Sequence, residues 1–398
     1  MNRARPVNRV LQVHTRYRLA GGEDRVVEAE RQLLESAGIS VDQVIFDNAD
    51  LRESRSLGAD LRLAASAVWS RRAARRVRGA VARHRSDIVH VHNTFAAASP
   101  SVFAAAGRVP VVHTLHNYRM VCPVATLFRD GHACTDCVGR AVAWPGVVHA
   151  CVRGSRSQSA VAAATISVHR ALGTFQRRIG LYVALTSFQR QLMIDGGLPA
   201  DRIHVISNFL EPDPGVMPGA RSGLLYAGRL AEEKGVAVLL RAVAALGPGV
   251  LRIAGAGPLT PDVEQAAATG YVEYLGLLDH SSVLASFRSA TAVVLPSIWF
   301  EGFPLAVVEA YATGTPVVAS RIGSLAEIVQ DGVTGLLAEP NDAVGLADRL
   351  RWAVEHPDEM RQMGANARRS YETRYRGRTH LAALMEGYAT VVEAHGHA

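Results

Sequence analysis

The chain has 398 residues, of which 48% are hydrophobic and 20% charged, and its formal net charge is +7. This length predicts two domains, and the composition excludes a disordered or fibrous protein because both domains can bury a core. No apolar run approaches the roughly 18 residues of a membrane-spanning helix, which argues against an integral membrane protein.

The excess of basic over acidic residues, with a pI near 9.5, favours anionic partners such as nucleic acid, anionic lipid or phosphorylated ligands. The amino-terminal residues lack the apolar region of a signal peptide and lead directly into a strand. A cytoplasmic protein is therefore expected.

Short β-branched runs alternate with longer helical patterns in the first half of the chain. This alternation predicts a parallel sheet with crossover helices. The expected strands cover residues 9–14, 41–46, 87–91, 110–115, 181–185 and 203–206. The expected helices cover residues 23–37, 60–85, 99–106 and 158–178. Residues 118–154 break the rhythm and are interpreted as an insertion.

Residues 211–219 contain three prolines and two glycines, which is the composition of a linker. The rhythm then restarts, with strands expected at residues 223–227, 250–254, 271–275, 292–295 and 316–319. The predicted fold is therefore α/β, with two doubly wound Rossmann-like domains that face each other across a cleft. The expected boundaries are residues 1–212, residues 220–376, and a carboxy-terminal helix over residues 377–398 that packs back on the first domain.

Lys234 is the only lysine among the 43 basic residues. It follows an apolar strand and a turn that contains Gly228 and Arg229. A strand, a glycine turn with two cations and then a helix is a pattern that presents a phosphate site. The alternative interpretation is a lysine that simply faces solvent.

Two glutamates mark a second candidate segment, directly after the strand expected at residues 292–295. Glu301 lies in the loop before a helix, Pro304 suits the first turn of that helix, and Glu309 lies on the helix itself. Both carboxylates can face the carboxyl end of the sheet, where the helix amides favour a phosphate. Carboxylates beside such a site are suited to binding neutral hydroxyl groups, as in dinucleotide folds.

Histidines follow or occupy the early strands. His116 stands at the carboxyl end of the fourth expected strand and is a candidate site residue. His113 lies inside that strand and is interpreted as a buried, hydrogen-bonded residue, while His14 at the end of the first strand is intermediate.

Four cysteines fall within thirty residues and include a C-x-x-C motif: Cys122, Cys134, Cys137 and Cys151. In a reducing compartment, such a cluster favours a metal site over disulfides. Four thiolates suit a structural zinc, with an iron–sulfur cluster less favoured, and a metal would stabilise an insertion that has little core of its own. Plain thiols and a redox dithiol remain the alternatives.

The stretch 61–85 has a helical pattern, and seven arginines lie between its positions 71 and 85: Arg71, Arg72, Arg75, Arg76, Arg78, Arg83 and Arg85. Such a helix could lie on an anionic membrane surface, which would suit a lipid-linked acceptor. The alternative is a helix that covers the sheet and exposes its arginines to solvent.

Arg229 and Lys234, followed by Glu301 and Glu309 with seven residues between the glutamates, resemble the donor site of the retaining family 4 glycosyltransferases, which have the GT-B fold. The resemblance continues at Gly21-Gly22 and at residues 87–93, 114–118 and 314–318, and so covers essentially the whole chain. The cysteine insertion resembles one found in a subset of that family, often linked to surface polysaccharides.

The resemblance implies a role for each matching residue. Arg229 and Lys234 bind the diphosphate of the donor, Glu301 binds sugar hydroxyls, and Glu309 holds the ribose. The implied lining of sugar and phosphates is Gly302, Phe303 and Pro304. Gly21 and Gly22 approach the donor from the first domain, and His116 lies near the reacting sugar. The site stabilises charge on the leaving group, so no cofactor or metal is required for the chemistry.

The predicted function is a retaining glycosyltransferase of the hexosyltransferase type. It would move a sugar from a UDP- or GDP-sugar to a glycan or lipid-linked acceptor in surface polysaccharide or glycoconjugate synthesis, in the cytoplasm or at the inner face of the membrane. A sugar-phosphate-accepting synthase of the same fold is the nearest alternative. A basic, metal-bearing nucleic-acid-binding protein is the alternative from another class, and it leaves Glu301 and Glu309 unexplained; nucleic acid is therefore not expected as a partner.

Overall fold

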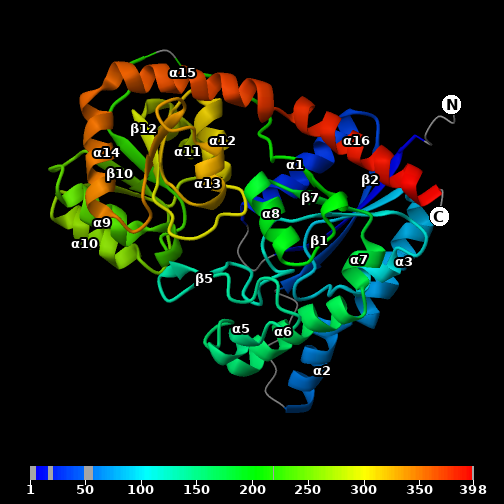
Figure 1. The fold of residues 1–398 in the computed structure, drawn as a ribbon. Coiled ribbons are helices and arrows are strands. Elements are labelled where there is room, and N and C mark those ends of the chain that lie inside the picture. Colours follow the sequence, from blue (N-terminus) through cyan, green and yellow to red (C-terminus); the bar gives the residue numbers. More distant parts are fainter. Residues whose placement is uncertain (1–5, 17–20, 49–56, 218, 397–398) are drawn as a thin grey trace. The chain divides into compact units, whose positions relative to one another are not determined.

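The computed structural model describes residues 6–16, 21–48, 57–217 and 219–396 (Figure 1). The chain divides into two compact units. The first comprises Met1–Leu127, Thr135–Ser207 and His380–Ala398, and the second comprises Phe128–Cys134 and Asn208–Thr379. Among the described helices, none is both long enough and apolar enough to cross a membrane.

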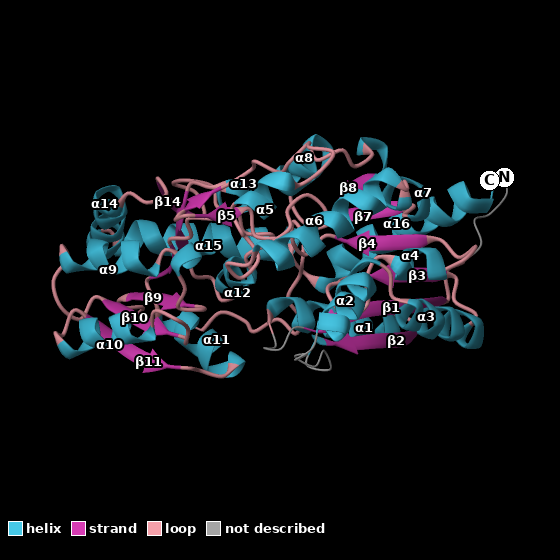
Figure 2. Ribbon diagram, turned by 90° about the horizontal axis from the view of Figure 1, so that it is seen from below, coloured by secondary structure: helices cyan, strands magenta, loops and turns pink. Residues whose placement is uncertain are grey.

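The first unit is built on a six-stranded parallel sheet in the order β2-β1-β3-β4-β7-β8 (Figure 2). Its strands are β1 (Arg9–Arg16), β2 (Ser40–Asp47), β3 (Ile88–Val91), β4 (Val111–Thr114), β7 (Leu181–Ala184) and β8 (Ile203–Val205). The central strands β3, β4 and β7 are buried at every residue, as expected for a parallel sheet covered on both faces. The strand order reverses between β1 and β3, and a ligand site is expected beyond the carboxyl ends of these strands.

Helices cover this sheet and form its flanks: α1 (Gly22–Ser36), α2 (Leu57–Val68), α3 (Arg71–His84), α4 (Ser101–Ala105), α5 (Trp144–Val148), α6 (Arg156–Ala171), α7 (Thr174–Arg178), α8 (Ser187–Asp195) and α16 (Gly377–Gly396). Two predicted helices are each divided. The stretch 60–85 breaks before α3 because the Ser70 side chain accepts a hydrogen bond from Ala73 N and caps a new helix. The stretch 158–178 breaks at Gly173, whose φ is +62°.

The second unit has its own six-stranded parallel sheet, in the order β11-β10-β9-β12-β13-β14 (Figure 2). Its strands are β9 (Leu224–Ala227), β10 (Leu251–Ala254), β11 (Val272–Gly276), β12 (Ala292–Leu295), β13 (Val317–Ser320) and β14 (Gly335–Ala338). This is the strand order of a dinucleotide-binding fold, with the switch point between β9 and β12. The sequence analysis missed β14, which contains no β-branched residue.

The helices of the second unit are α9 (Val236–Ala244), α10 (Thr260–Ala268), α11 (His280–Ser289), α12 (Leu305–Ala312), α13 (Gly323–Ile328), α14 (Ala343–Glu355) and α15 (Pro357–Arg374). A short antiparallel hairpin, β5 (Phe128–Arg129) and β6 (His132–Ala133), also belongs to this unit. The prediction of two doubly wound α/β domains is confirmed.

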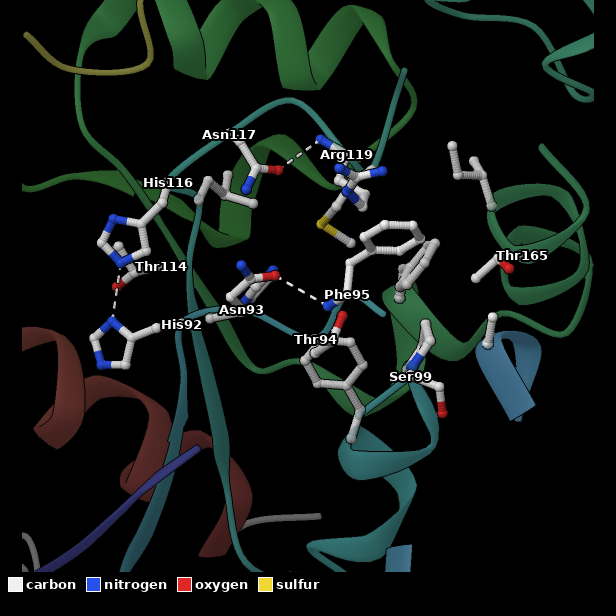
Figure 3. A pocket seen from close by; sticks show the side chains of 18 residues that line it. His92, Asn93, Thr94, Phe95, Ser99, Thr114, His116, Asn117, Arg119 and Thr165 are labelled. Carbon is white, nitrogen blue, oxygen red and sulfur yellow. Dashed lines mark hydrogen bonds between the residues drawn. The ribbon is translucent and has the colours of Figure 1, made fainter. Parts of the chain in front are cut away.

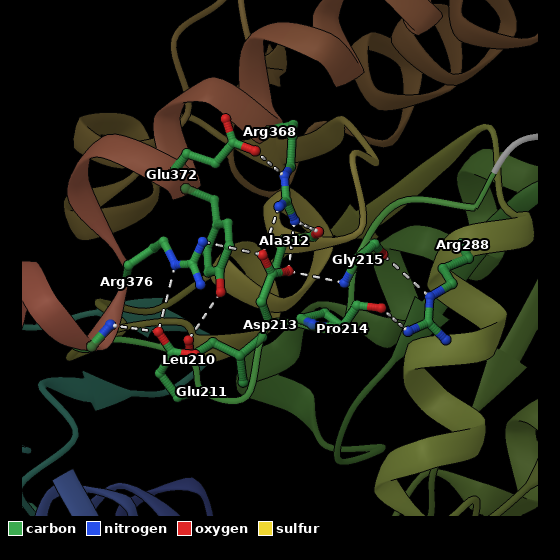
Figure 4. Close-up of polar contacts among 12 residues, drawn as sticks. Leu210, Glu211, Asp213, Pro214, Gly215, Arg288, Ala312, Arg368, Glu372 and Arg376 are labelled. Carbon is green, nitrogen blue, oxygen red and sulfur yellow. Dashed lines mark hydrogen bonds and ion pairs between the residues drawn. The ribbon is translucent and has the colours of Figure 1, made fainter. Parts of the chain in front are cut away.

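The proline-rich segment that precedes the second sheet is held by arginines (Figure 4). Arg368 donates to both carboxylate oxygens of Asp213, at 2.7 and 2.6 Å, and Arg288 donates to the carbonyl of Pro214. The hydrogen bonds from Arg368 hold the pKa of Asp213 below its ordinary value. A linker composition therefore does not make this segment a loose spacer, because its polar groups are bound within the second unit.

Candidate active site

The loop after β9 carries the two cations that the sequence analysis singled out. It ends in a single turn of 3₁₀-helix, Glu232–Lys234, and Gly235 follows with a φ of +71°. A Cβ atom at Gly235 would lie 1.9 Å from the carbonyl oxygen of Pro296, so only glycine allows this turn to approach the loop after β12. The close approach brings the loops on the two sides of the switch point into contact.

Lys234 and Glu301 form an ion pair across that contact. The Lys234 Nζ atom lies 2.7 and 2.9 Å from the two carboxylate oxygens of Glu301, and Ser297 Oγ donates to Glu301 Oε1 at 2.7 Å. Burial opposes the ionised form of Glu301, but Lys234, together with the hydrogen bond from Ser297, holds the pKa of Glu301 below its ordinary value. The pair is therefore charged, and its half-buried ammonium is available to a further anion.

Arg229 lies on the same loop in a different environment. Its side chain is 58% exposed and forms an ion pair with Glu233, while its carbonyl accepts a hydrogen bond from Tyr226 at 2.7 Å. The backbone of Arg229 is thus held in place, and its guanidinium extends toward solvent. The structure places Arg229 and Lys234 on one loop at the switch point, as the sequence pattern indicated.

Glu309 is buried on α12 and pairs with a histidine that the sequence analysis missed. Its Oε1 atom lies 2.9 Å from Nε2 of His280, the first residue of α11. The two residues are 29 positions apart and come from neighbouring helices. A histidine at the start of a helix carries no local pattern for this contact, so only the packing of α11 beside α12 identifies it.

The loop before α12 contains the other predicted lining residues. Pro304 is the residue that precedes the helix, and Gly302 accepts a hydrogen bond from Ser324 through its carbonyl, at 3.2 Å. Phe303 packs into the apolar cluster of the second unit, with its ring centre 6.1 Å from that of Tyr375. The Phe303 side chain therefore anchors the loop, which leaves the backbone of this loop to line a ligand.

In the first unit, Gly21 and Gly22 precede and begin α1. The Gly21 amide donates to Asp24 Oδ2 at 3.0 Å, and the ring of His14 at the end of β1 lies 2.7 Å from Asp24 Oδ1. A Cβ atom at Gly21 would meet no atom within 4 Å. The space beside this turn is therefore open within the described part of the unit, and the approach of a ligand there stays a prediction.

His116 follows β4 and is half-buried, with its Nε2 atom 3.0 Å from Nδ1 of His92. The two rings are stacked, with their centres 5.3 Å apart. His113, by contrast, is buried and donates from Nδ1 to the carbonyl of Val91 at 2.8 Å. Burial lowers the pKa of His113 to about 4, which agrees with the interpretation of His113 as a neutral core residue.

A cavity of about 50 Å³ lies beside His116 in the first unit (Figure 3). Its wall is apolar and includes Phe103, Ile166 and Phe175. Its polar lining includes Asn93, Asn117 and Arg119. The Arg119 guanidinium stacks 3.8 Å from the centre of the Phe95 ring and donates to Pro123 O at 2.8 Å, so this cation is fixed in position. The cavity has room for a few water molecules.

Glu23 is a further candidate that the sequence analysis did not select. It stands on the first turn of α1, and its Oε1 atom lies 3.7 Å from Nδ1 of His14. Burial, with a contribution from the neighbouring charge of Asp24, raises the pKa of Glu23 from 4.5 to about 8. A carboxyl group that exchanges its proton near neutral pH is typical of functional sites. Its position directly after Gly21-Gly22 is the sequence feature that could have identified Glu23 as a candidate.

Glu23→Gln is expected to raise the Tm of the protein increasingly from pH 5 to pH 8. In the wild type, the unfolded chain ionises at Glu23 above about pH 4.5 while the folded chain stays protonated up to about pH 8, so stability is lost across this window. The glutamine variant has no such loss. Thermal unfolding at each pH in this window measures the difference in Tm between the variant and the wild type. Glu386→Gln, at an exposed position of α16, is the control. A difference in Tm that does not change with pH would contradict the assigned pKa.

The four cysteines of the insertion have different surroundings. Cys122 and Cys137 are buried, and Cys134 and Cys151 are partly exposed. Among the described residues, the one group of three metal-ligating side chains whose ligand atoms lie within 4.8 Å of one another is Glu30, His90 and His92. A structural metal at the cysteines stays a prediction, which zinc and iron analysis of the purified protein would test.

Comparison with known proteins connects both units to a family. Residues 20–214 match the family described as Glycosyltransferase Family 4, and residues 216–370 match Glycosyl transferases group 1. The D-inositol 3-phosphate glycosyltransferase of Pseudarthrobacter chlorophenolicus is 30% identical over 330 residues, which are 79% of this chain and 73% of that protein. The glycogen synthase of Mycobacterium tuberculosis is 36% identical over 173 residues, and the match spans only 42% of either chain.

Solved structures share the fold over nearly the whole chain. The sucrose-phosphate synthase of Thermosynechococcus elongatus superimposes with a TM-score of 0.71 at 18% identity, covering 97% of this chain and 100% of the other. HepE of Anabaena, determined with UDP, has a TM-score of 0.66 at 18% identity, covering 96% and 99%. The GT-B fold class predicted from the sequence is confirmed.

Proposed function

Because the chain belongs to the family 4 glycosyltransferases, we propose that it transfers a hexose from a nucleotide-diphosphate sugar to a hydroxyl acceptor, with retention of the anomeric configuration. The acceptor is a glycan or a lipid-linked sugar, and the product serves surface polysaccharide or glycoconjugate synthesis. HepE, a structural neighbour, binds UDP and UDP-glucose, which supports a nucleotide-sugar donor.

The ion pair of Lys234 with Glu301 at the switch point is the single observation that carries the proposal. An ammonium held at 2.7 Å by a buried carboxylate cannot move to meet a ligand, so its position is set before the donor binds. In the proposed complex, Lys234 contacts the diphosphate and Glu301 accepts hydrogen bonds from sugar hydroxyls. Arg229, on the same loop and exposed, reaches the same phosphates.

The proposed chemistry is stabilisation of a leaving group. The bond from the sugar to the β-phosphate oxygen breaks, and negative charge develops on the diphosphate. Lys234, Arg229 and the amides before α12 receive that charge. Because the configuration is retained and no side chain is assigned as a nucleophile, the acceptor hydroxyl attacks from the face that the diphosphate leaves. Its oxygen bonds to the anomeric carbon, and its proton passes to the departing β-phosphate oxygen.

Transfer from a panel of UDP- and GDP-sugars tests the function. Purified protein, cell extract and each donor are expected to give a product one hexose heavier than its acceptor, with an α-linkage when the donor is an α-sugar nucleotide. Mass spectrometry identifies the product and NMR its anomeric configuration. Absence of transfer and of donor hydrolysis across the panel would refute the proposal.

A phosphorylated acceptor is the second candidate. The relatives named D-inositol 3-phosphate glycosyltransferase favour it, as does the fixed guanidinium of Arg119 beside the cavity of the first unit. Adding sugar phosphates and inositol phosphates to the donor panel separates the two candidates. A product only with phosphorylated acceptors would replace the first acceptor class by the second.

Peripheral membrane binding through α3 is also proposed. The arginines of this helix and of its carboxyl-terminal cap, at positions 71, 72, 75, 76, 78, 83 and 85, are exposed. The apolar face of α3 is buried in the first unit, through Ala73, Val77 and Ala80. Contact with a membrane would therefore be electrostatic. Co-sedimentation with anionic but not neutral vesicles is expected, and equal binding to both would contradict it.

A further inference from the structure

A buried polar network lies behind His116 in the first unit. Its centre is Glu30, a carboxylate that is 1% exposed and comes from α1. Gln12 donates to Glu30 Oε1 at 3.0 Å, and His90 Nδ1 lies 3.0 Å from the same oxygen. His92 Nε2 lies 3.3 Å from it. The proposed chemistry of the donor site does not use Glu30, and the family resemblance assigned it no role.

We propose that Glu30, acting through His92, holds His116 in the tautomer that carries its proton on Nε2 and leaves Nδ1 as a hydrogen-bond acceptor for a ligand hydroxyl. Glu30 and His92 are then positioning residues, and His116 touches the ligand. This inference rests on the proposed function for the identity of that ligand, a sugar. The assignment of the protons follows from the contacts of the network, with the effect of burial on each group beside them, in three steps.

Glu30 is ionised and therefore offers only acceptors. Burial opposes its charge, but His90 and the hydrogen bond from His380 hold the pKa of Glu30 well below its ordinary value. His380 supports the charge from the other side: its Nδ1 lies 2.9 Å from the carbonyl of Ser207 and its Nε2 lies 3.4 Å from Glu30 Oε2. Both ring nitrogens of His380 thus face acceptors.

His92 must place its proton on Nε2. The contact of this atom with Glu30 Oε1 at 3.3 Å is bent, and so acts as a charge–dipole contact rather than a straight hydrogen bond. The other tautomer would direct a lone pair at the carboxylate. Burial lowers the pKa of His92 to about 3, so the ring is neutral and its Nδ1 carries no proton.

His116 must then donate. Its Nε2 lies 3.0 Å from the unprotonated Nδ1 of His92, and a hydrogen bond at this distance requires the proton on His116 Nε2. Burial holds the pKa of His116 well below its usual value, so this ring is neutral as well. Its Nδ1 is a lone-pair acceptor, and no described residue takes that atom as a hydrogen-bond partner.

A metal ion bound by Glu30, His90 and His92 is the competing interpretation of this network. A metal would bind the lone pair of His92 Nε2, so the His92 proton would lie on Nδ1. His116 Nε2 would then accept a hydrogen bond from His92, and the His116 proton would lie on Nδ1, the opposite of the proposed tautomer. The contacts of His90 disfavour it. Its Nδ1 lies 2.8 Å from the Tyr388 hydroxyl and its Nε2 lies 2.7 Å from Thr114 Oγ1, so both nitrogens are already engaged.

The tautomers can be observed directly, without donor or acceptor. In the full-length protein with ¹⁵N-labelled histidine, long-range ¹H–¹⁵N spectra are expected to show His92 and His116 each protonated on Nε2, with the His116 signals assigned by their loss in His116→Gln. A His116 ring protonated on Nδ1, or a His92 ring with a metal-bound Nε2, would overturn the proposal. The spectrum is independent of activity, so the proposed function can fail while this inference stands.

Removing the carboxylate tests the role of Glu30. Glu30→Met, which keeps the volume of the side chain, is expected to let His116 populate both tautomers and to raise the KM for the sugar donor about tenfold, the effect of one hydrogen bond. Glu28→Gln on the exposed face of the same helix is the matched control and should change neither. A single Nε2–H tautomer of His116 in Glu30→Met would show that Glu30 is not needed. Should that variant not fold, the wild-type spectrum still decides.

Discussion

Replacing Lys234 by alanine is expected to lower kcat/KM for the sugar donor by about 100- to 1,000-fold, the usual effect of losing one preorganised group that stabilises a leaving anion. The effect should fall mainly on kcat because negative charge on the diphosphate is greatest as the bond to the sugar breaks. Steady-state kinetics with the active donor measures both constants. Arg241→Ala, which removes one exposed cation from α9, is the control for the change in net charge.

The same substitution leaves the Glu301 carboxylate buried without its cation, and some loss of stability is expected with it. The double variant Lys234→Ala/Glu301→Gln separates the two effects. It should regain Tm, because the unpaired charge is gone, and it should not regain activity. If activity returned together with stability, Lys234 would be a structural partner of Glu301 and would have no role in charge stabilisation.

Glu309→Gln is expected to weaken binding of the nucleoside diphosphate about 10- to 100-fold. The carboxylate is proposed to accept hydrogen bonds from the two ribose hydroxyls, and hydrogen bonds to a charged group are worth about 1.5–3 kcal/mol. Glutamine has almost the same volume, so the buried position on α12 is kept filled. Calorimetric titration with UDP and with GDP measures the affinity and identifies the preferred base.

Glu264→Gln, at an exposed position on α10, should leave that affinity unchanged. Because Glu309 is proposed to contact the ribose and not the sugar that is transferred, the loss should occur equally with the nucleoside diphosphate and with the intact donor. Unchanged affinity for UDP and GDP in Glu309→Gln would remove Glu309 from the donor site. Its role would then be structural.

Local pattern was sufficient to predict the second half of the candidate site. Arg229 and Lys234 stand in the loop after one strand, next to a glycine turn, while Glu301 stands in the loop after another strand and Glu309 on the helix that follows. In a doubly wound sheet, these are the positions at the carboxyl ends of the strands. Their place at the switch point therefore follows from the alternation of strands and helices, and the structure agrees.

Contacts between distant parts of the chain could not be predicted. Lys234 and Glu301 are 67 residues apart, and their ion pair depends on the approach of Gly235 to Pro296. Glu30 and His380 are 350 residues apart and meet because α16, from His380 on, belongs to the first unit. Such pairs depend on strand order and helix packing, which a single sequence does not encode locally.

The sequence by itself determined the two parallel sheets and the identity of the charged loops, because strand periodicity, glycine turns and charge are local properties of the chain. The tertiary structure alone decided which of these groups are paired and how deeply Glu23 and Glu30 are buried. Burial and pairing set the charge state of a side chain, and both arise only when distant segments pack together.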